Sequence, residues 1–231
     1  EIASVVSPGM NHDITKDSAE ATWEEMELMI AREGNMTLNG MLLMAVAGVI
    51  ASVGLMNSVL HLVVAAMVIA PGFEPVARVS LSLACGSGSW RRGFIDTGKG
   101  YSSLLAGAFL GAALVRLIQG SEPGGSYLPA GVLLEYWSSI TATSLLASAV
   151  AGAAGGVLIA TNRSILTAGV MIALALIPTP AVVAIGVLDG DFDMAGRGLL
   201  RWIIEVVIVL VLTVLVFTWK RVHIQKRAIW W

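Results

Sequence analysis

The feature that most constrains this sequence is a succession of six apolar segments, each close to the length that crosses a membrane. They occupy residues of about 38–56, 59–84, 100–118, 139–160, 164–188 and 199–219. A helix needs roughly 20 apolar residues to span the hydrocarbon core of a bilayer. Charged residues make up 13% of the chain, against about 25% in soluble domains. We therefore expect an all-α, polytopic integral membrane protein with about six transmembrane helices.

Two of these segments contain prolines. The second reads Met-Val-Ile-Ala-Pro-Gly-Phe-Glu-Pro-Val-Ala-Arg from Met67 to Arg78, and the fifth contains Leu-Ile-Pro-Thr-Pro, which ends at Pro180. A proline removes a backbone donor and kinks or breaks a helix. In lipid the carbonyl groups that are freed need partners inside the protein or in a water-filled cavity. We therefore expect the second and fifth helices to be broken.

The two proline segments belong to an internal repeat. Ala45-Val46-Ala47-Gly48 recurs as Ala149-Val150-Ala151-Gly152, a displacement of 104 residues, and the match of Pro75 with Pro180 keeps nearly the same displacement. Each copy holds three spans, so the second copy must cross the membrane in the opposite sense. Inverted repeats whose matching helices are interrupted near the bilayer midplane are typical of many transporters. The sequence thus predicts two inverted three-helix repeats.

The chain divides into six segments on this basis. Residues 1–14 include the turn signal Pro8-Gly9 and are interpreted as a linker or the tail of a missing upstream region. Residues 15–37 combine apolar positions at helical spacing with an acidic face, which predicts an amphipathic helix. The others are the first three-helix repeat (38–118), an extracytoplasmic loop (119–138), the second, inverted repeat (139–219) and a basic cytoplasmic tail (220–231).

Basic residues set the expected orientation. They follow the second span at Arg91, Arg92 and Lys99, the fourth at Arg163, and the sixth in the tail from Lys220. With six spans, all three groups lie on the same side of the membrane, which the positive-inside rule makes cytoplasmic. We expect a prokaryotic cytoplasmic (inner) membrane with both termini inside.

The candidate site lies at the two proline breaks. Ionisable residues inside a span are costly and usually face a bundle interior or a cavity. Glu74 and Arg78 lie four residues apart in the second span, so they share one helical face. The alternative is a structural ion pair that fixes the broken helix. The predicted solute-binding residues are Pro71, Gly72, Glu74, Pro75, Arg78, Pro178, Thr179, Pro180 and Gly186.

Other polar and small residues receive structural interpretations. Arg201 and Glu205, also four residues apart, are interpreted as an ion pair at the membrane interface. Asp189, Asp191 and Asp193 alternate like a cation loop but lack the remaining ligands of a calcium motif. The small residues of the fourth span, which are Gly152, Gly155 and Gly156, predict close helix packing.

Several functional classes are not supported by any motif. The sequence has no Walker loop, no Gly-x-Ser-x-Gly elbow and no His-Glu-x-x-His, which argues against an enzyme. Its single cysteine, Cys85, excludes an internal disulfide framework and a cysteine metal cluster. The sequence has no long run of basic residues of the kind that binds nucleic acid. We therefore expect no catalytic residue, no cofactor and no metal.

The order of these motifs resembles one family. The motifs are, in order, an acidic amphipathic helix ending in Arg-Glu, a Leu-Asn-Gly-Met-Leu-Leu-Met-Ala span, the Ala-Pro-x-x-x-Pro break, a Gly-x-Gly-Ser-Trp loop and the Leu-Ile-Pro-Thr-Pro-Ala-Val-Val-Ala-Ile-Gly segment. Over residues of about 20–219 the chain is similar to the prokaryotic "domain of unknown function 389" membrane proteins. The resemblance implies a bacterial or archaeal cytoplasmic membrane and often a separate upstream soluble domain. It implies no activity, substrate or catalytic residue.

Two functions remain open at this stage. The first is a membrane transporter or channel for a small polar or ionic solute, with the site at the paired broken helices. The second is a non-transporting oligomeric scaffold or sensor that relays a signal to a soluble domain. The expected partners are the lipid bilayer, further copies of the chain and, for the first function, the solute.

Overall fold

The computed structural model describes residues 28, 30–32, 34–86, 88–119, 131–161 and 176–223, and this part of the chain is helical with short connections. The expected all-α fold is therefore confirmed. Most of the predicted amphipathic helix at 15–37 lies outside the described residues, as does 164–175 of the fifth span. The helices are α3 (Leu38–Met56), α4 (Leu60–Ile69), α5 (Glu74–Cys85), α6 (Trp90–Gln119), α7 (Val132–Ser138), α8 (Ala142–Ala160), α10 (Pro178–Asp189) and α11 (Phe192–His223).

Four of these helices, α3, α6, α8 and α11, are long and apolar enough to cross a membrane. The pair α4 and α5 counts as a fifth span if its two parts, bent by 52°, are taken together. Between 22% and 39% of the apolar window of each long helix is buried inside the chain. The remaining apolar side chains face outward, as expected for helices that contact lipid. The described residues thus support a membrane protein with four or five spans.

The second span breaks where its prolines predict. Ala70, which precedes Pro71, has an extended backbone, because the residue before a proline is disfavoured in the helical region. A new helix, α5, then begins at Glu74 with Pro75 in its first turn. Proline is tolerated there because the first N–H groups of a helix have no acceptor within it.

The two halves of the chain contain helices of matching length and ends. α3 and α8 each have 19 residues and follow a threonine N-cap, Thr37 or Thr141. α5 and α10 each have 12 residues, carry proline in the first turn and end at a glycine with φ near 74°, Gly86 (φ 74) or Gly190 (φ 73). Glycine suits both C-caps because the left-handed backbone strains other residues.

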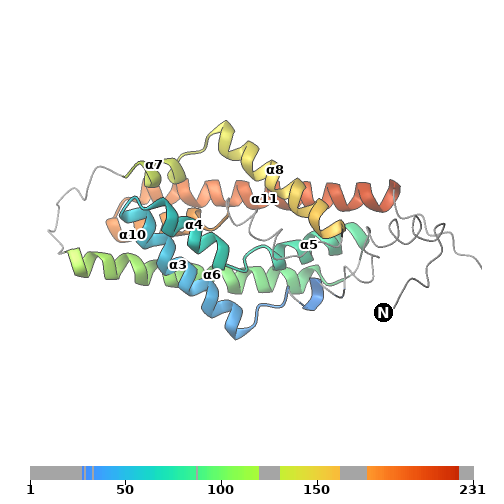
Figure 1. Cartoon of the computed structure of the whole chain (residues 1–231), viewed down its shortest axis with the longest axis horizontal. Coiled ribbons are helices and arrows are strands. Elements are labelled where there is room, and N and C mark those ends of the chain that lie inside the picture. Colours follow the sequence, from blue (N-terminus) through green and yellow to red (C-terminus); the bar gives the residue numbers. More distant parts are fainter. Residues whose placement is uncertain are drawn as a thin grey trace, which may run out of the picture.

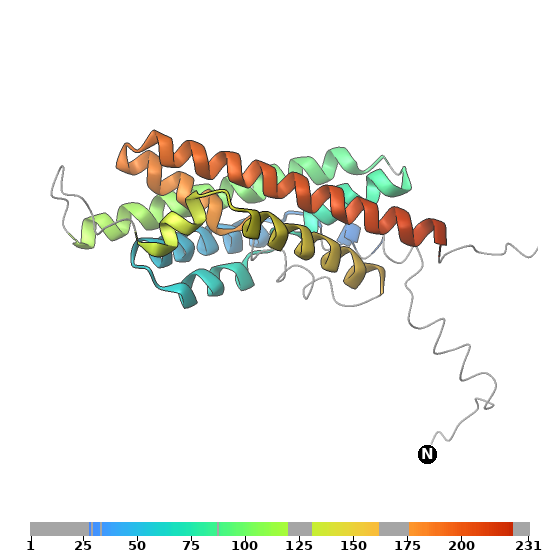
Figure 2. The ribbon, with the colours of Figure 1, turned by 90° about the horizontal axis from the view of Figure 1, so that it is seen from above.

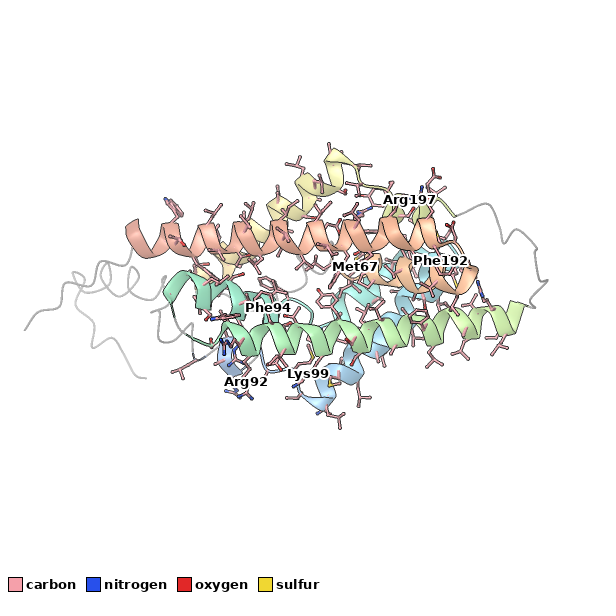
Figure 3. All side chains as sticks on the ribbon, turned by 180° about the vertical axis from the view of Figure 1, so that it is seen from behind. Met67, Arg92, Phe94, Lys99, Phe192 and Arg197 are labelled. Atoms are coloured by element: carbon pink, nitrogen blue, oxygen red, sulfur yellow. The ribbon has the colours of Figure 1, made fainter. Side chains whose placement is uncertain are left out.

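The long helices α6 and α11 enclose the broken ones. They run in opposite directions along the molecule, with α5 and α10 between them (Figures 1 and 3). α5 and α10 each start near the middle and run outward to opposite ends (Figure 1). Figure 2 shows α8 lying along α11, and α3 packs in the same way on α6.

α6 and α11 begin earlier than the sequence predicted. Their first residues are Trp90 and Phe192, whereas the predicted spans began near 100 and 199. Only the apolar part of each helix had been counted, although the polar residues before it continue the same helix. In Figure 3, Phe94 near the start of α6 and Phe192 at the start of α11 lie on opposite sides of the middle of the molecule. The predicted loop at 119–138 likewise contains a short helix, α7.

Small residues let the outer helices approach the long ones. A Cβ on Gly107 would overlap the carbonyl group of Ala45, so α3 and α6 pack backbone to backbone. On α8, Gly152 accepts a hydrogen bond from the Thr213 hydroxyl at 3.1 Å, and Gly156 packs on Val216. The predicted close packing of the fourth span is confirmed, and its partner is α11 of the same chain.

Candidate functional site

The structure has two helix breaks, at residues 70–73 before α5 and at Ile177, the bend before α10, and they meet in the middle of the molecule. Gly72, just before α5, faces Ile177, the N-cap of α10, since a Cβ on Gly72 would lie 3.1 Å from Ile177 Cδ1. The hydroxyl of Tyr101 on α6 donates to the Gly72 carbonyl at 3.5 Å. The ring of Tyr101 lies 5.0 Å from that of Trp202 on α11. Residues from both halves and both long helices therefore share one centre.

Most of the predicted site residues lie at this centre or one turn from it. Glu74, a buried carboxylate, opens α5, where the partial positive charge of a helix N-terminus favours an anion. Gly186 is the exception, because it lies two turns along α10 and packs against α11. A Cβ at this position would lie 2.8 Å from Ala195 N. Its position indicates a contribution to the packing of α10 on α11. The residues at the start of the two broken helices are Pro71, Gly72, Glu74, Pro75, Pro178, Thr179 and Pro180.

Arg78 belongs to a second polar cluster, with partners that the sequence did not indicate. Its Nη1 donates to Asn35 Oδ1 at 2.8 Å and lies 3.7 Å from Asp96 Oδ2. Asp96 is also 3.6 Å from Lys99 Nζ. We call Asn35, Arg78, Asp96 and Lys99 the Arg78 cluster. It joins the segment before α3 to α5 and α6, which agrees with a structural role for Arg78.

Arg201 and Glu205 form the ion pair that the sequence predicts, but they form it in the interior of the protein. Arg201 Nε donates to Glu205 Oε1 at 2.8 Å, and both side chains are only 1% exposed. The predicted ion pair is therefore confirmed, but it is buried inside the protein rather than exposed on its surface. Because α11 begins at Phe192, Arg201 lies more than two turns inside the helix. The spacing of four residues was visible in the sequence, but the depth depended on where the helix starts.

Arg201 also connects α11 to α7. Its Nη1 donates to the carbonyl groups of Tyr136 and Ser139, the second at 2.7 Å. The guanidinium lies 4.9 Å from the ring centre of Trp137 and 5.4 Å from that of Tyr136. Cation–π contacts of this kind strengthen when they are removed from water. The short helix α7 is thus fixed against α11 by one buried side chain.

Through Glu205, the Arg201–Glu205 pair reaches the second helix break, at the start of α10. Within the part of the chain that the structure describes, its Oε2 atom is buried without a hydrogen-bond partner. The hydroxyl of Thr179, in the first turn of α10, lies beside the carboxylate but outside hydrogen-bond geometry. A buried carboxylate oxygen without a donor is expensive, and such atoms often mark a place where water or a ligand binds.

A cavity of about 400 Å³ borders the pair. This volume lies in the range of small-molecule sites. Met67, which Figure 3 labels near the middle of the molecule, is part of its wall. The other lining residues come from α4 (Leu60, Val64), α7 (Tyr136, Trp137), α8 (Ser144, Ala147, Ser148, Val150, Ala151) and α11 (Arg201, Glu205).

The three aspartates between α10 and α11 have separate partners. Asp189 pairs with Arg116 on α6, and Asp193 pairs with Arg197 at 2.9 Å. Asp191 accepts a backbone N–H from the first turn of α11 at 2.9 Å. Among the described residues, no group of three His, Cys, Asp or Glu side chains is arranged to hold a metal ion.

The family model for "Domain of unknown function (DUF389)" matches residues 67–224. The chain belongs to this family. The DUF389 match includes both helix breaks and the Arg201–Glu205 pair, and it confirms the resemblance seen in the motifs. An uncharacterized protein of Methanocaldococcus jannaschii is 25% identical over 252 aligned positions, which cover 98% of this chain and 72% of the relative. No solved structure matches this DUF389 chain.

Proposed function

We propose that this DUF389 protein is a membrane transporter or channel for a small polar or ionic solute. The observation that carries the proposal is the contact between Gly72 and Ile177, which brings the two helix breaks together beside the buried Arg201–Glu205 pair. Ionisable residues buried in a membrane bundle are costly and usually mark a solute or ion pathway. In this proposal the solute passes along the cavity wall that carries Glu205.

The arrangement of the helices supports an inverted repeat. α8 begins 104 residues after α3, and α10 begins 104 residues after α5, the displacement that the sequence repeat predicts. α6 and α11 run in opposite directions, and α5 and α10 run outward from the centre toward opposite ends (Figure 1). Interrupted helices at the interface of inverted repeats hold the solute in many transporters.

The electrostatics of the centre also favour a polar solute. α5 and α10 start near the middle of the molecule (Figure 1), so two helix N-termini, each equivalent to about half a positive charge, lie there. Glu74 is a buried carboxylate at the start of α5, and Glu205 is a buried carboxylate on α11. Fixed charges of both signs are thus available to a solute without reorganisation of the backbone.

Two observations weaken the scaffold alternative. The second break, Pro178 to Pro180, is buried inside the chain rather than exposed on an outer seam. The small-residue face of α8 is covered by α11, so it is not available to another subunit. One observation favours a sensor: the Asn35–Arg78 hydrogen bond connects the segment before α3 to the broken helix. Self-association and a cytoplasmic membrane with both termini inside stay part of the proposal.

The test is solute and ion flux in liposomes that contain the purified chain, across a panel of anions, cations, protons and small neutral polar molecules. The variants are Glu74→Gln and Glu205→Gln, with Arg197→Gln as the matched control because Arg197 is an exposed member of a surface ion pair. We expect flux above that of empty liposomes, lost in one or both glutamate variants and kept in the control. If the wild type shows no flux above that of empty liposomes for any solute of the panel, the transport proposal is rejected.

A further inference from the structure

The cavity beside Arg201 offers one acceptor and one donor at its polar end. Glu205 Oε2 and Trp137 Nε1 are both buried, and neither has a hydrogen-bond partner within the described segments. Glu205 is 0% exposed and Trp137 is 8% exposed, and both line the cavity. Both residues also lie against the Arg201 guanidinium.

The other polar groups of the cavity are already occupied. Arg201 uses Nε for Glu205 and Nη1 for two carbonyl groups. The hydroxyls of Ser144 and Ser148 donate within α8, to Thr141 O at 2.8 Å and to Ser144 O at 3.0 Å. The Thr179 hydroxyl lies beside Glu205 but outside hydrogen-bond geometry. In the described geometry the carboxylate oxygen therefore still lacks a donor and the indole N–H an acceptor.

The zero net charge of the Arg201–Glu205 pair favours a ligand without net charge. Arg201 and Glu205 together carry no net charge, and the other lining side chains are uncharged, many of them apolar, such as Leu60, Val64 and Met67. A ligand with a net charge would stay uncompensated in these surroundings, which is unfavourable. A hydroxyl group satisfies both requirements because it donates one hydrogen bond and accepts others.

We propose that the cavity binds a neutral amphipathic molecule with one hydroxyl group and a small apolar or aromatic body. The hydroxyl donates to Glu205 Oε2 and accepts from Trp137 Nε1, while the body packs on Met67, Ala151 and Tyr136. The volume of about 400 Å³ fits such a ligand, since small-molecule sites start near 300 Å³. This inference deepens the proposed function by naming a solute class for the same site.

The experiment compares three probes with one carbon skeleton: para-fluorobenzyl alcohol, para-fluorobenzylammonium and para-fluorobenzoate. Each is titrated by fluorine NMR onto the full chain in nanodiscs and onto empty nanodiscs. We expect saturable binding of the alcohol, and binding of both ions at least about tenfold weaker, because the ions are taken out of water without a partner charge. Bulk partition into lipid is removed by the empty-disc control.

Variants locate the binding site. Ala151→Trp fills the cavity and should abolish saturable binding, whereas Val157→Trp, on an exposed part of the same helix, should leave it unchanged. Trp137→Phe removes the indole N–H donor and should weaken binding of the alcohol about fivefold, the effect of one hydrogen bond. Glu205→Gln leaves Arg201 uncompensated and should reverse the preference, so that benzoate binds better than the alcohol. Circular dichroism and thermal unfolding identify any variant that fails to fold.

Three results would overturn the inference. They are binding of the alcohol that does not saturate, as expected if lipid acyl chains fill the cavity; saturable binding that survives Ala151→Trp in a folded protein; and a wild-type preference for either ion. The outcome is distinguishable from that of the transport proposal. Alcohol binding without any flux would reject transport and keep the ligand site, and flux without alcohol binding would do the reverse.

Discussion

Gly72 and Ile177, which belong to different halves of the chain, face each other so closely that a Cβ on Gly72 would lie 3.1 Å from Ile177 Cδ1. The same Cβ would lie 3.2 Å from the Tyr101 hydroxyl. A glycine at this position therefore allows the two helix breaks to touch. The contact is the point from which α5 and α10 diverge.

The first prediction concerns this contact. Gly72→Val should destabilise the folded protein by about 1–3 kcal/mol, because a larger side chain pushes the two breaks apart. Adding Ile177→Ala to Gly72→Val should recover part of the loss, since it removes the atoms nearest to the new side chain. Thermal unfolding in detergent of the two single variants and the double variant measures the coupling. Strictly additive effects would contradict a direct contact between the breaks.

The second prediction concerns the Arg201–Glu205 pair. Glu205→Leu should lower the free energy of unfolding by about 3–5 kcal/mol, because it leaves a buried guanidinium without its counter-charge. Arg201→Met combined with Glu205→Leu should be less damaging than Glu205→Leu alone, although the bonds to Tyr136 and Ser139 are lost. Chemical denaturation of both variants tests this. If the double variant were the less stable of the two, the pair would not be coupled as the structure indicates.

The third prediction compares two glycines of α6. Gly107→Ala should destabilise the protein by about 1–3 kcal/mol, since its Cβ would overlap the Ala45 carbonyl. Gly98→Ala should be neutral or stabilising by up to about 1 kcal/mol, because nothing lies within 4 Å of the position of its Cβ. The difference in unfolding temperature between the two variants is the readout. Equal effects would argue against tight packing between α3 and α6.

The fourth prediction concerns the Arg78 cluster. Asn35→Ala removes the acceptor that Arg78 Nη1 uses at 2.8 Å and should destabilise the protein by about 1.5–3 kcal/mol, the range for hydrogen bonds to charged groups. Asn39→Ala, at an exposed position on α3, serves as the control. Hydrogen exchange of the first turn of α5 should rise in Asn35→Ala and not in the control. No difference between the variants would reject a coupling between this segment and the broken helix.

The local features of the fold were predictable from the sequence because they depend on local chemistry. Pro71 and Pro75 forbid a continuous helix, and the structure breaks the second span between Ile69 and Glu74. Runs of apolar residues likewise defined α3 and α8 to within a few residues. The all-α class and the family followed from the same patterns.

The candidate site was predictable only in part because burial depends on tertiary packing. The proline breaks were located correctly, but Arg78 finds Asn35 and Asp96 as partners, and no spacing rule connects residues that far apart. Arg201 and Glu205 have the spacing of a surface ion pair, and only the position of α7 and α8 against α11 encloses them. Trp137 lines the cavity, and no motif of the sequence marks it as a site residue.

The most direct test of the account is a cross-link across the helix breaks. In a background with Cys85→Ser, which removes the single native cysteine, Gly72→Cys and Ile177→Cys are combined and the protein is reconstituted into liposomes. We predict that oxidation joins the two cysteines in a disulfide and stops the solute flux. Reduction of the disulfide should restore the flux. Unchanged flux through fully cross-linked protein would contradict a pathway at the meeting point of the two broken helices.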